Sequence, residues 1–223
     1  MNAAVDAPQN TDLWERIHAA QTWDSESDFP SHNAQAFAQH HLRGRMKILD
    51  LGCGSGSAAR YFAGKGHDVA GIDASATVIA KARLLTDPSR ANIDFSVGNF
   101  DEVPCGDSFY DAVFSDGALY YASAKYFRLA VDEIHRVLKP GGVARIYTAS
   151  NRHKWAEEGR ALGQNTYIVD ADHYENGLMV YCPPLFAVQD VFKEFSSLHI
   201  GIEEFNYMSI TRVNSFWVIT ATK

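Results

Sequence analysis

The sequence predicts an α/β fold built on a doubly wound, mostly parallel sheet, because short apolar runs alternate with helical patterns from Met46 onward. The apolar runs are bounded by Gly, Asp or Asn and show little alternation, which is typical of parallel strands buried on both faces. Right-handed connections between such strands place helices on both faces of the sheet. The expected strands are residues 46–51, 67–73, 92–98, 109–115 and 142–149.

Helical patterns fill the stretches between these strands. Residues 57–66 follow a glycine-rich turn, and residues 75–87 begin with a serine, a residue type that caps helix N-termini. A third pattern, residues 124–142, closes on Lys-Pro-Gly-Gly, which ends helices.

The C-terminal part departs from this alternation. Residues 151–182 are polar and aromatic with little periodicity, and a helical pattern with proline at its start follows over residues 183–198. Two alternating runs, residues 199–209 and 215–223, are typical of an antiparallel hairpin that closes one edge of the sheet.

Composition excludes several classes of protein. A chain of 223 residues with a formal net charge of -7 lacks the basic surface that holds a polyanion, so nucleic acid is not an expected partner. No apolar run reaches the length of a membrane span, and the first twelve residues have no signal-peptide pattern. Cys53, Cys105 and Cys182 show neither disulfide nor metal-ligand spacing, which favours a reducing compartment and hence the cytoplasm.

The stretch "ILDLGCGSGSAARYF" predicts a ligand site. A strand, a tight glycine turn and a helix bring backbone N–H groups to a polar or anionic group of a ligand. Gly52 and Gly54 lack side chains, which lets the ligand approach the backbone closely. The spacing Gly52-x-Gly54-x-Gly56 is not the G-x-G-x-x-G of dinucleotide folds, and the lysine of a phosphate-binding loop is missing. Asp73 ends the second strand, where a carboxylate accepts hydrogen bonds from ribose hydroxyls.

These residues resemble the class I S-adenosylmethionine-dependent methyltransferases, from about Met46 to the C-terminus. "ILDLGCGSG" looks like the first family motif, "GIDAS" the ribose motif, "VGNFDEVP" the adenine motif and "SFYDAVFSDGALYY" the strand and loop that face the methyl group. The resemblance implies a Rossmann-like seven-stranded sheet, mostly parallel with one antiparallel edge strand. It also implies that S-adenosylmethionine is bound by Asp50, Gly52, Cys53, Gly54, Asp73, Ala74, Asn99, Phe100 and Ser115.

The adenine motif departs from the family pattern. Asn99 stands where the family has an acid, and its amide oxygen can still accept from the adenine amino group. Asp101 is an alternative source of the missing carboxylate. Phe100 is placed either to pack on the adenine or to join the core.

Catalytic candidates follow from the chemistry of methyl transfer, which needs an oriented acceptor and a base when the acceptor is a hydroxyl. By the resemblance, the face above the methyl group includes the loops after the fourth and fifth strands. His153 is the first candidate for a base and His173 the second, and Tyr120 or its neighbour Tyr121 faces the acceptor. Asp170, Asp172 and His173 have no fixed ligand spacing, so we expect no metal.

The ends of the chain are expected to shape the site. Residues 1–45, with helical patterns at 11–23 and 31–44, are predicted to form an N-terminal lid on the methyltransferase domain of residues 46–223. Trp14 and Trp23 either cover the cofactor or staple these helices to the domain. An insertion at about residues 151–183 is expected to shape the acceptor pocket.

The predicted function is therefore methyl transfer to a hydroxyl or amine of a small organic molecule. The alternative is a noncatalytic adenosine-ligand binder or regulatory protein with the same fold. A nicotinamide-dependent oxidoreductase is disfavoured by the glycine spacing, and a nucleic-acid methyltransferase by the charge and by the absence of an N/D-P-P-Y/F motif after "AVFSD". The sequence carries no signal for an oligomeric state.

Overall fold

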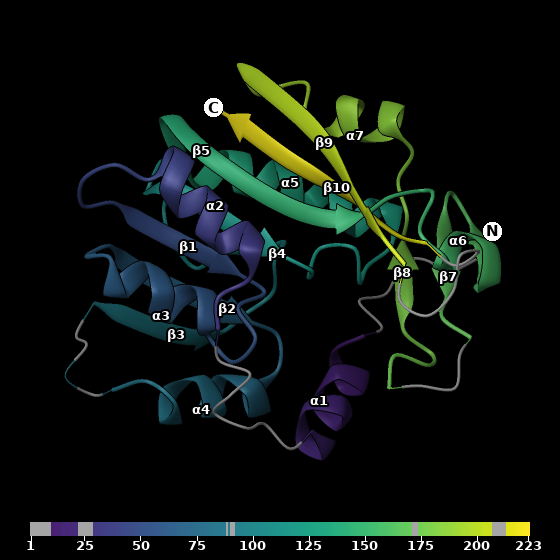
Figure 1. Cartoon of the computed structure of the whole chain (residues 1–223), viewed down its shortest axis with the longest axis horizontal. Coiled ribbons are helices and arrows are strands. Elements are labelled where there is room, and N and C mark those ends of the chain that lie inside the picture. Colours follow the sequence, from purple (N-terminus) through teal and green to yellow (C-terminus); the bar gives the residue numbers. More distant parts are fainter. Residues whose placement is uncertain (1–9, 22–28, 88, 90–91, 171–173, 207–212) are drawn as a thin grey trace.

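The computed structural model describes residues 10–21, 29–87, 89, 92–170, 174–206 and 213–223. Figure 1 shows one large twisted sheet with helices on both faces and a small sheet beyond one end of it. The large sheet consists of β1 (Lys47–Leu51), β2 (Asp68–Asp73), β3 (Ile93–Val97), β4 (Tyr110–Asp116), β5 (Leu138–Ala149), β9 (Ser197–Phe205) and β10 (Asn214–Thr222).

The strand order in the large sheet is β3-β2-β1-β4-β5-β10-β9. The first five strands are parallel, and β10 runs antiparallel to both β5 and β9. This confirms the predicted seven-stranded, mostly parallel sheet with an antiparallel pair at one edge. The order reverses between β1 and β4, and ligands of such sheets bind in the crevice at that switch point, outside the carboxyl ends of the strands.

Three helices cover one face of the sheet, α2 (His32–His41), α3 (Ser57–Gly64) and α4 (Ala76–Leu84). Their apolar side chains meet the sheet in one buried cluster. Phe37 of α2 stacks on Phe114 of β4 with ring centroids 5.7 Å apart, and Phe62 of α3 meets the same ring edge-on at 5.2 Å. This aromatic cluster holds α2 against the sheet, and Ser31 caps the start of the helix, within the helical pattern predicted at residues 31–44.

The opposite face is covered by α5 (Ala124–Val137) and α7 (Leu185–Val191). The buried positions of α5 recur at i, i+3, i+4 and i+7, so one stripe of the helix faces the sheet. The stripe consists of Phe127, Ala130, Val131, Ile134 and Val137.

Two element boundaries differ from the prediction. β5 begins at Leu138, because the Lys-Pro-Gly-Gly stretch continues the chain as extended backbone and Leu138 pairs with Tyr110, with a register shift after that pair. The glycines therefore form an irregularity inside a strand and do not separate the helix from it. α7 ends at Val191, well before the predicted end, since β9 starts at Ser197.

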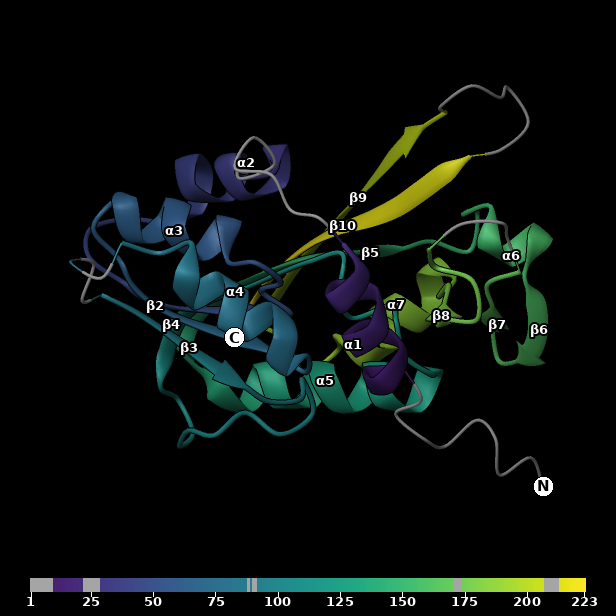
Figure 2. The same cartoon turned by 90° about the horizontal axis from the view of Figure 1, so that it is seen from below.

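The remaining elements lie beyond the carboxyl ends of the strands. α1 (Thr11–Ala20) lies between α4 and the small sheet in both views (Figures 1 and 2). The small sheet has the order β6-β7-β8, and a short helix precedes it. These elements are α6 (Trp155–Glu158), β6 (Arg160–Gly163), β7 (Thr166–Ile168) and β8 (Met179–Tyr181).

The small sheet was not predicted, because strands of three or four residues are too short to show alternation. It is joined to the main domain by the backbone hydrogen bond from Tyr181 N–H to the Tyr120 carbonyl, 2.7 Å long. Its buried side chains form a third cluster with Ile17 of α1, Trp155 of α6 and Phe216 of β10. Within the described ranges, no helix has the length and apolar character needed to cross a membrane.

Candidate cofactor and acceptor site

The glycine turn after β1 is held against the end of β2. The N–H groups of Gly52 and Cys53 both donate to the carbonyl of Ile72, at 2.7 and 3.0 Å. Gly52 has φ +76°, and a Cβ on it would lie 2.2 Å from the Cβ of Ala118. Glycine is therefore required here both by the backbone and by the loop that follows β4.

Gly54 has a different reason to lack a side chain. Its φ is +52°, and a Cβ on this residue would meet nothing within 4 Å. Its N–H donates to Oδ2 of Asp73 at 3.0 Å. The open space above Gly54 is part of a cavity, so this glycine lets a ligand approach the backbone.

Asp73 links the two halves of the turn. Oδ2 accepts the N–H of Gly54, and Oδ1 accepts the N–H of Ser75 at 3.0 Å. Burial raises the pKa of Asp73, and these two amide hydrogen bonds oppose that rise because they favour the ionised form. An ionised carboxylate has about four acceptor positions, so roughly two remain for a ligand.

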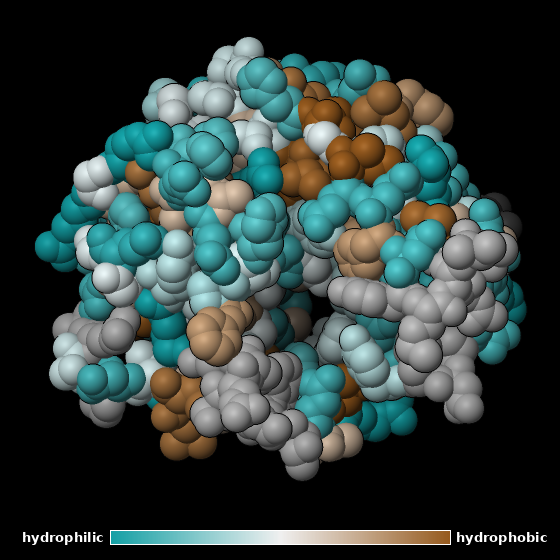
Figure 3. Space-filling model, viewed as in Figure 1, coloured by the Kyte–Doolittle hydropathy of each residue, from teal (hydrophilic) through white to brown (hydrophobic). Residues whose placement is uncertain are grey.

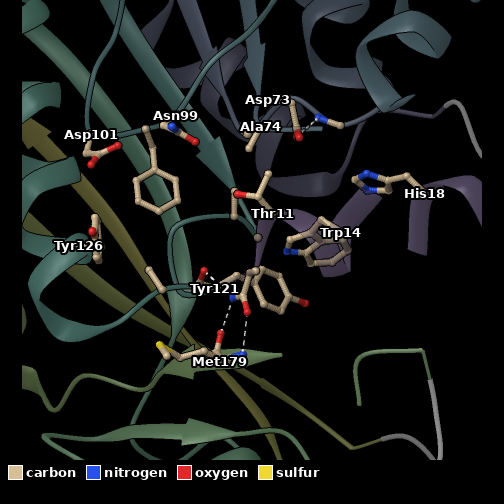
Figure 4. Close-up of a pocket in the computed structure, with 17 residues that line it drawn as sticks. Thr11, Trp14, His18, Asp73, Ala74, Asn99, Asp101, Tyr121, Tyr126 and Met179 are labelled. Atoms are coloured by element: carbon tan, nitrogen blue, oxygen red, sulfur yellow. Dashed lines mark hydrogen bonds between the residues drawn. The ribbon is translucent and has the colours of Figure 1, made fainter. Parts of the chain in front are cut away.

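The cavity has a volume of about 210 Å³ and lies outside the carboxyl ends of β1, β2 and β4, at the switch point of the sheet. Figure 4 shows Asp73, Ala74, Asn99 and Asp101 along one side, with Tyr121 and Met179 opposite and α1 beside them. The space-filling view shows the surface hollowed near the centre, above α1 (Figure 3).

The structure brings most of the predicted cofactor residues to the cavity wall. Gly52, Gly54, Asp73 and Ala74 line it, and the segment 99–101 lines it as well. Asn99 and the alternative Asp101 are therefore both available to one ligand. Phe100 lines the cavity and also packs against the main core cluster, so this ring borders both.

Three predicted cofactor residues are not on the cavity wall. The Sγ of Cys53 points into the protein, where a Cβ on Gly71 would lie 3.1 Å from it. The hydroxyl of Ser115 donates to the Leu51 carbonyl at 2.8 Å and joins β4 to β1. Asp50 is 2% exposed. These three side chains pack inside the protein next to the glycine turn and do not face the cavity.

The Asp50 carboxyl accepts a hydrogen bond from the backbone N–H of Ala59 in the first turn of α3. Among the described residues, no group donates to its Oδ2. Burial, with the nearby Asp116 carboxylate, raises the pKa of Asp50 to about 8. Folding therefore favours the protonated form of this carboxyl.

The side of the cavity away from the sheet is built by α1. Thr11, Trp14 and His18 line the cavity, and their i, i+3, i+7 spacing puts them on one face of the helix. Trp14 stacks on His18 with ring centroids 5.1 Å apart and meets Tyr121 edge-on at 4.7 Å. Trp14 therefore both borders the cavity and holds α1 to the domain, and Trp23 lies outside the described residues.

Polar side chains hold α1 at its start and at its middle. Asn10, 8% exposed, donates from Nδ2 to the carbonyls of Tyr121 and Met179, both at 2.7 Å, and its Oδ1 accepts the Met179 N–H at 2.9 Å. The Glu15 carboxylate accepts the N–H groups of Ala76 and Thr77 at the start of α4. An anionic side chain stabilises that position because it faces a helix N-terminus.

Tyr121, which lines the cavity, is joined to Tyr120 and to the buried carboxyl of Glu175 behind it. The Tyr121 hydroxyl donates to Oε1 of Glu175, and the Tyr120 hydroxyl lies 3.4 Å from that of Tyr121. The sequence did not single out Glu175, because it follows an aperiodic segment and its partner is 54 residues away.

The two predicted catalytic residues lie on the other side of this wall. His153 and Tyr120 line a second cavity of about 280 Å³ together with Lys154, Trp155, Glu175 and Phe216. His153 is 1% exposed, and its Nδ1 accepts the Trp155 N–H at 3.3 Å. Burial, with the nearby Lys154, lowers the pKa of His153 to about 3, which weakens it as a base at neutral pH.

Within the described part of the chain, no group of three His, Cys, Asp or Glu side chains is arranged to hold a metal ion. Asp170 is described, whereas Asp172 and His173 lie outside the described residues.

Comparison with known proteins agrees with this geometry. Residues 48–142 match the family model described as a methyltransferase domain. An uncharacterized methyltransferase of Synechocystis is 31% identical over 110 residues, which are 49% of this chain and 50% of that protein. A malonyl-(acyl-carrier protein) O-methyltransferase of Enterobacter lignolyticus is 29% identical over 131 residues, 58% of this chain and 50% of that protein.

Solved structures of methyltransferases share this fold. A solved S-adenosylmethionine-dependent methyltransferase of Methanosarcina mazei superimposes with a TM-score of 0.68 at 20% identity, over 84% of this chain and 96% of that one. Residues 48–142 are therefore a methyltransferase domain, and the chain has the fold of the class I S-adenosylmethionine-dependent methyltransferases. It spans about half the length of the curated relatives it matches.

The open side of Gly54 gives a matched test of the cavity. Gly54→Ala and Gly44→Ala both place a Cβ at a left-handed residue with nothing within 4 Å, but Gly44 is remote from the cavity. Both variants should lose about 1–2 kcal/mol of stability in urea denaturation. Only Gly54→Ala should weaken binding of S-adenosylhomocysteine by calorimetry, by about 10-fold or more, because its methyl group fills ligand space. Equal affinities for the two variants would contradict this assignment.

The buried Asp50 predicts a pH dependence of stability. Between about pH 4 and pH 8 the unfolded chain has Asp50 ionised while the folded chain keeps it protonated, so this residue lowers stability as pH rises, by up to about 1.4 kcal/mol per pH unit. Asp50→Asn removes this pH-dependent loss of stability, because an amide does not ionise. Its stability relative to wild type, measured by urea denaturation without ligand, should therefore rise from pH 5 to pH 8 and then level off.

Asp94→Asn, which removes an exposed carboxylate on β3, controls for the loss of one negative charge. The pH profile of Asp94→Asn should follow that of wild type. Parallel profiles for Asp50→Asn and wild type would show that Asp50 is ionised in the folded protein.

Proposed function

We propose that this protein transfers the methyl group of S-adenosylmethionine to a neutral or cationic hydroxyl or amine acceptor of small size. The observation that carries the proposal is one cavity that joins the glycine turn, Asp73 and the segment 99–101 on one side to Tyr121 and Met179 on the other. A cofactor half and an acceptor half thus share one space.

The residues present fit S-adenosylmethionine. The unobstructed Gly54 backbone leaves room for the amino-acid end of the cofactor, and Asp73 keeps two acceptor positions for the ribose hydroxyls. Ala74 and Phe100 offer apolar surface to the adenine, with Asn99 and Asp101 at hand for its amino group. When bound, S-adenosylmethionine supplies an electrophilic methyl group on a sulfonium centre.

The acceptor half of the cavity favours an uncharged or positively charged ligand. The described residues on the acceptor side of the cavity, Trp14, Tyr121 and Met179, include no lysine or arginine. A carboxylate or phosphate on the acceptor would therefore lack a cationic partner there. The named substrate of the malonyl-(acyl-carrier protein) relatives has a free carboxylate, so we do not carry it over to this chain.

Catalysis by this chain rests on orientation and exclusion of water. Tyr121 lines the cavity, and the hydrogen bond from its hydroxyl to Glu175 fixes the direction of the ring. An acceptor held between Tyr121 and Trp14 is shielded by α1, which Asn10 and Glu15 fasten to the domain. His153 and Tyr120 support this wall from the second cavity, in place of the direct roles that the sequence predicted.

The lid and the insertion belong to the same proposal. α1, from the predicted lid of residues 1–45, closes the cavity over the turn, and β8, from the predicted insertion at 151–183, supplies Met179 to the wall. Acceptor specificity therefore depends on the two segments outside the region that matches the family model.

Calorimetric titration tests the cofactor half of the proposal. S-adenosylmethionine and S-adenosylhomocysteine should bind in the micromolar range, while NAD should not bind. Absence of binding by both sulfur ligands would refute the proposal.

A radiolabelled-methyl assay tests the acceptor half. Phenols, alcohols and amines should accept label, and matched carboxylic acids should not. Asp73→Asn serves as the control for contaminating activity, because it should lower transfer by at least about 10-fold through loss of a charged hydrogen-bond acceptor. Binding of the sulfur ligands with no transfer to any acceptor would favour the noncatalytic alternative, and transfer confined to carboxylates would contradict the proposed acceptor class.

A further inference from the structure

His18 is held at the cavity by α1 and faces the acidic end of β2. Its ring stacks on Trp14 with an interplanar angle of 27°, and it lines the cavity beside Trp14 and Thr11 (Figure 4). The Asp73 carboxylate is close enough to act on the charge of the imidazole. His18 and Asp73 therefore approach the same part of the cavity from opposite elements.

The position of His18 is fixed by the contacts that other residues of α1 and its N-cap make. Asn10 holds the start of α1 to the backbone of Tyr121 and Met179, and Glu15, one turn before His18, holds the helix to the start of α4. Ile17 is buried in the cluster formed with the small sheet. The ring thus belongs to the cavity wall and does not depend on a ligand for its placement.

The charges around His18 come from three elements. Asp73 at the end of β2 and Glu15 on α1 favour the protonated ring, while Lys81 on α4 opposes it. Burial is the largest influence and lowers the pKa of His18 below its ordinary value. A neutral imidazole has one N–H donor and one acceptor nitrogen.

Asp73 alone can bind the hydroxyl protons of a ribose diol but not the hydroxyl oxygens. Its carboxylate accepts the two hydroxyl protons but has no proton to donate, so the hydroxyl oxygens need a donor from elsewhere. The N–H of a neutral imidazole is such a donor. We propose that His18 is a second ribose-binding residue, which donates a hydrogen bond to a ribose hydroxyl oxygen whose proton goes to Asp73. This inference rests on the proposed binding of an adenosine cofactor.

Titration of the full chain with S-adenosylhomocysteine and with 5′-methylthioadenosine, which lacks the amino-acid end, tests this role. His18→Phe keeps a ring to stack on Trp14 and removes the N–H, so it should bind both ligands about 3- to 10-fold more weakly than wild type. His18→Gln and His18→Asn place an amide N–H where one of the two ring nitrogens stood, and at least one of them should restore binding. His41→Phe is the matched control, because His41 packs on Phe37 away from the cavity, and its affinity should equal that of wild type.

Competition by adenosine and its 2′-deoxy and 3′-deoxy analogues locates the contact. Removal of the hydroxyl that His18 contacts should weaken binding to wild type more than binding to His18→Phe. Equal penalties in the two proteins for both analogues would overturn the proposal, as would a His18→Phe affinity within two-fold of wild type. A loss seen with S-adenosylhomocysteine but not with 5′-methylthioadenosine would also overturn it, because the contact would then be to the amino-acid end. Failure of the wild-type protein to bind either ligand would instead refute the proposed function.

Discussion

The hydrogen bonds of Asp73 to Gly54 and Ser75 are the contacts on which the site depends. They join the turn after β1 to the start of α4, so the positions of both backbone segments follow from one carboxylate. That carboxylate is partly buried, and a buried charge without partners is costly, so the two amide donors stabilise it. The same group that builds the turn is left able to bind a diol.

The rest of the molecule encloses this point from two sides. Sheet and helices fix the crevice at the switch between β1 and β4, as they do in other doubly wound folds. α1 and the small sheet then cover the crevice, fastened to each other through Asn10 and to the domain through Glu15. The cofactor half is thus built from local turns, whereas the acceptor half is built from contacts between distant segments.

That division explains what the sequence could predict. The strands, the glycine turn and the position of Asp73 at the end of β2 were readable because each depends on neighbouring residues and on short-range patterns. Asn10 and Glu175 were not, since their partners lie 169 and 54 residues away and no local pattern marks them. The i, i+3, i+7 spacing of Thr11, Trp14 and His18 was visible, but only the structure shows which way that face of α1 turns. Likewise, the sequence does not show that His153 is buried and that burial lowers its pKa.

The most direct test of this account is a crystal structure of the protein with S-adenosylhomocysteine. The account predicts that both ribose hydroxyl oxygens lie within hydrogen-bond distance of the Asp73 carboxylate, about 2.5–3.0 Å, while Asp73 still accepts the N–H groups of Gly54 and Ser75. A ribose bound elsewhere, or an Asp73 that gives up either backbone hydrogen bond to reach it, would contradict the claim that one carboxylate both builds the turn and binds the ligand.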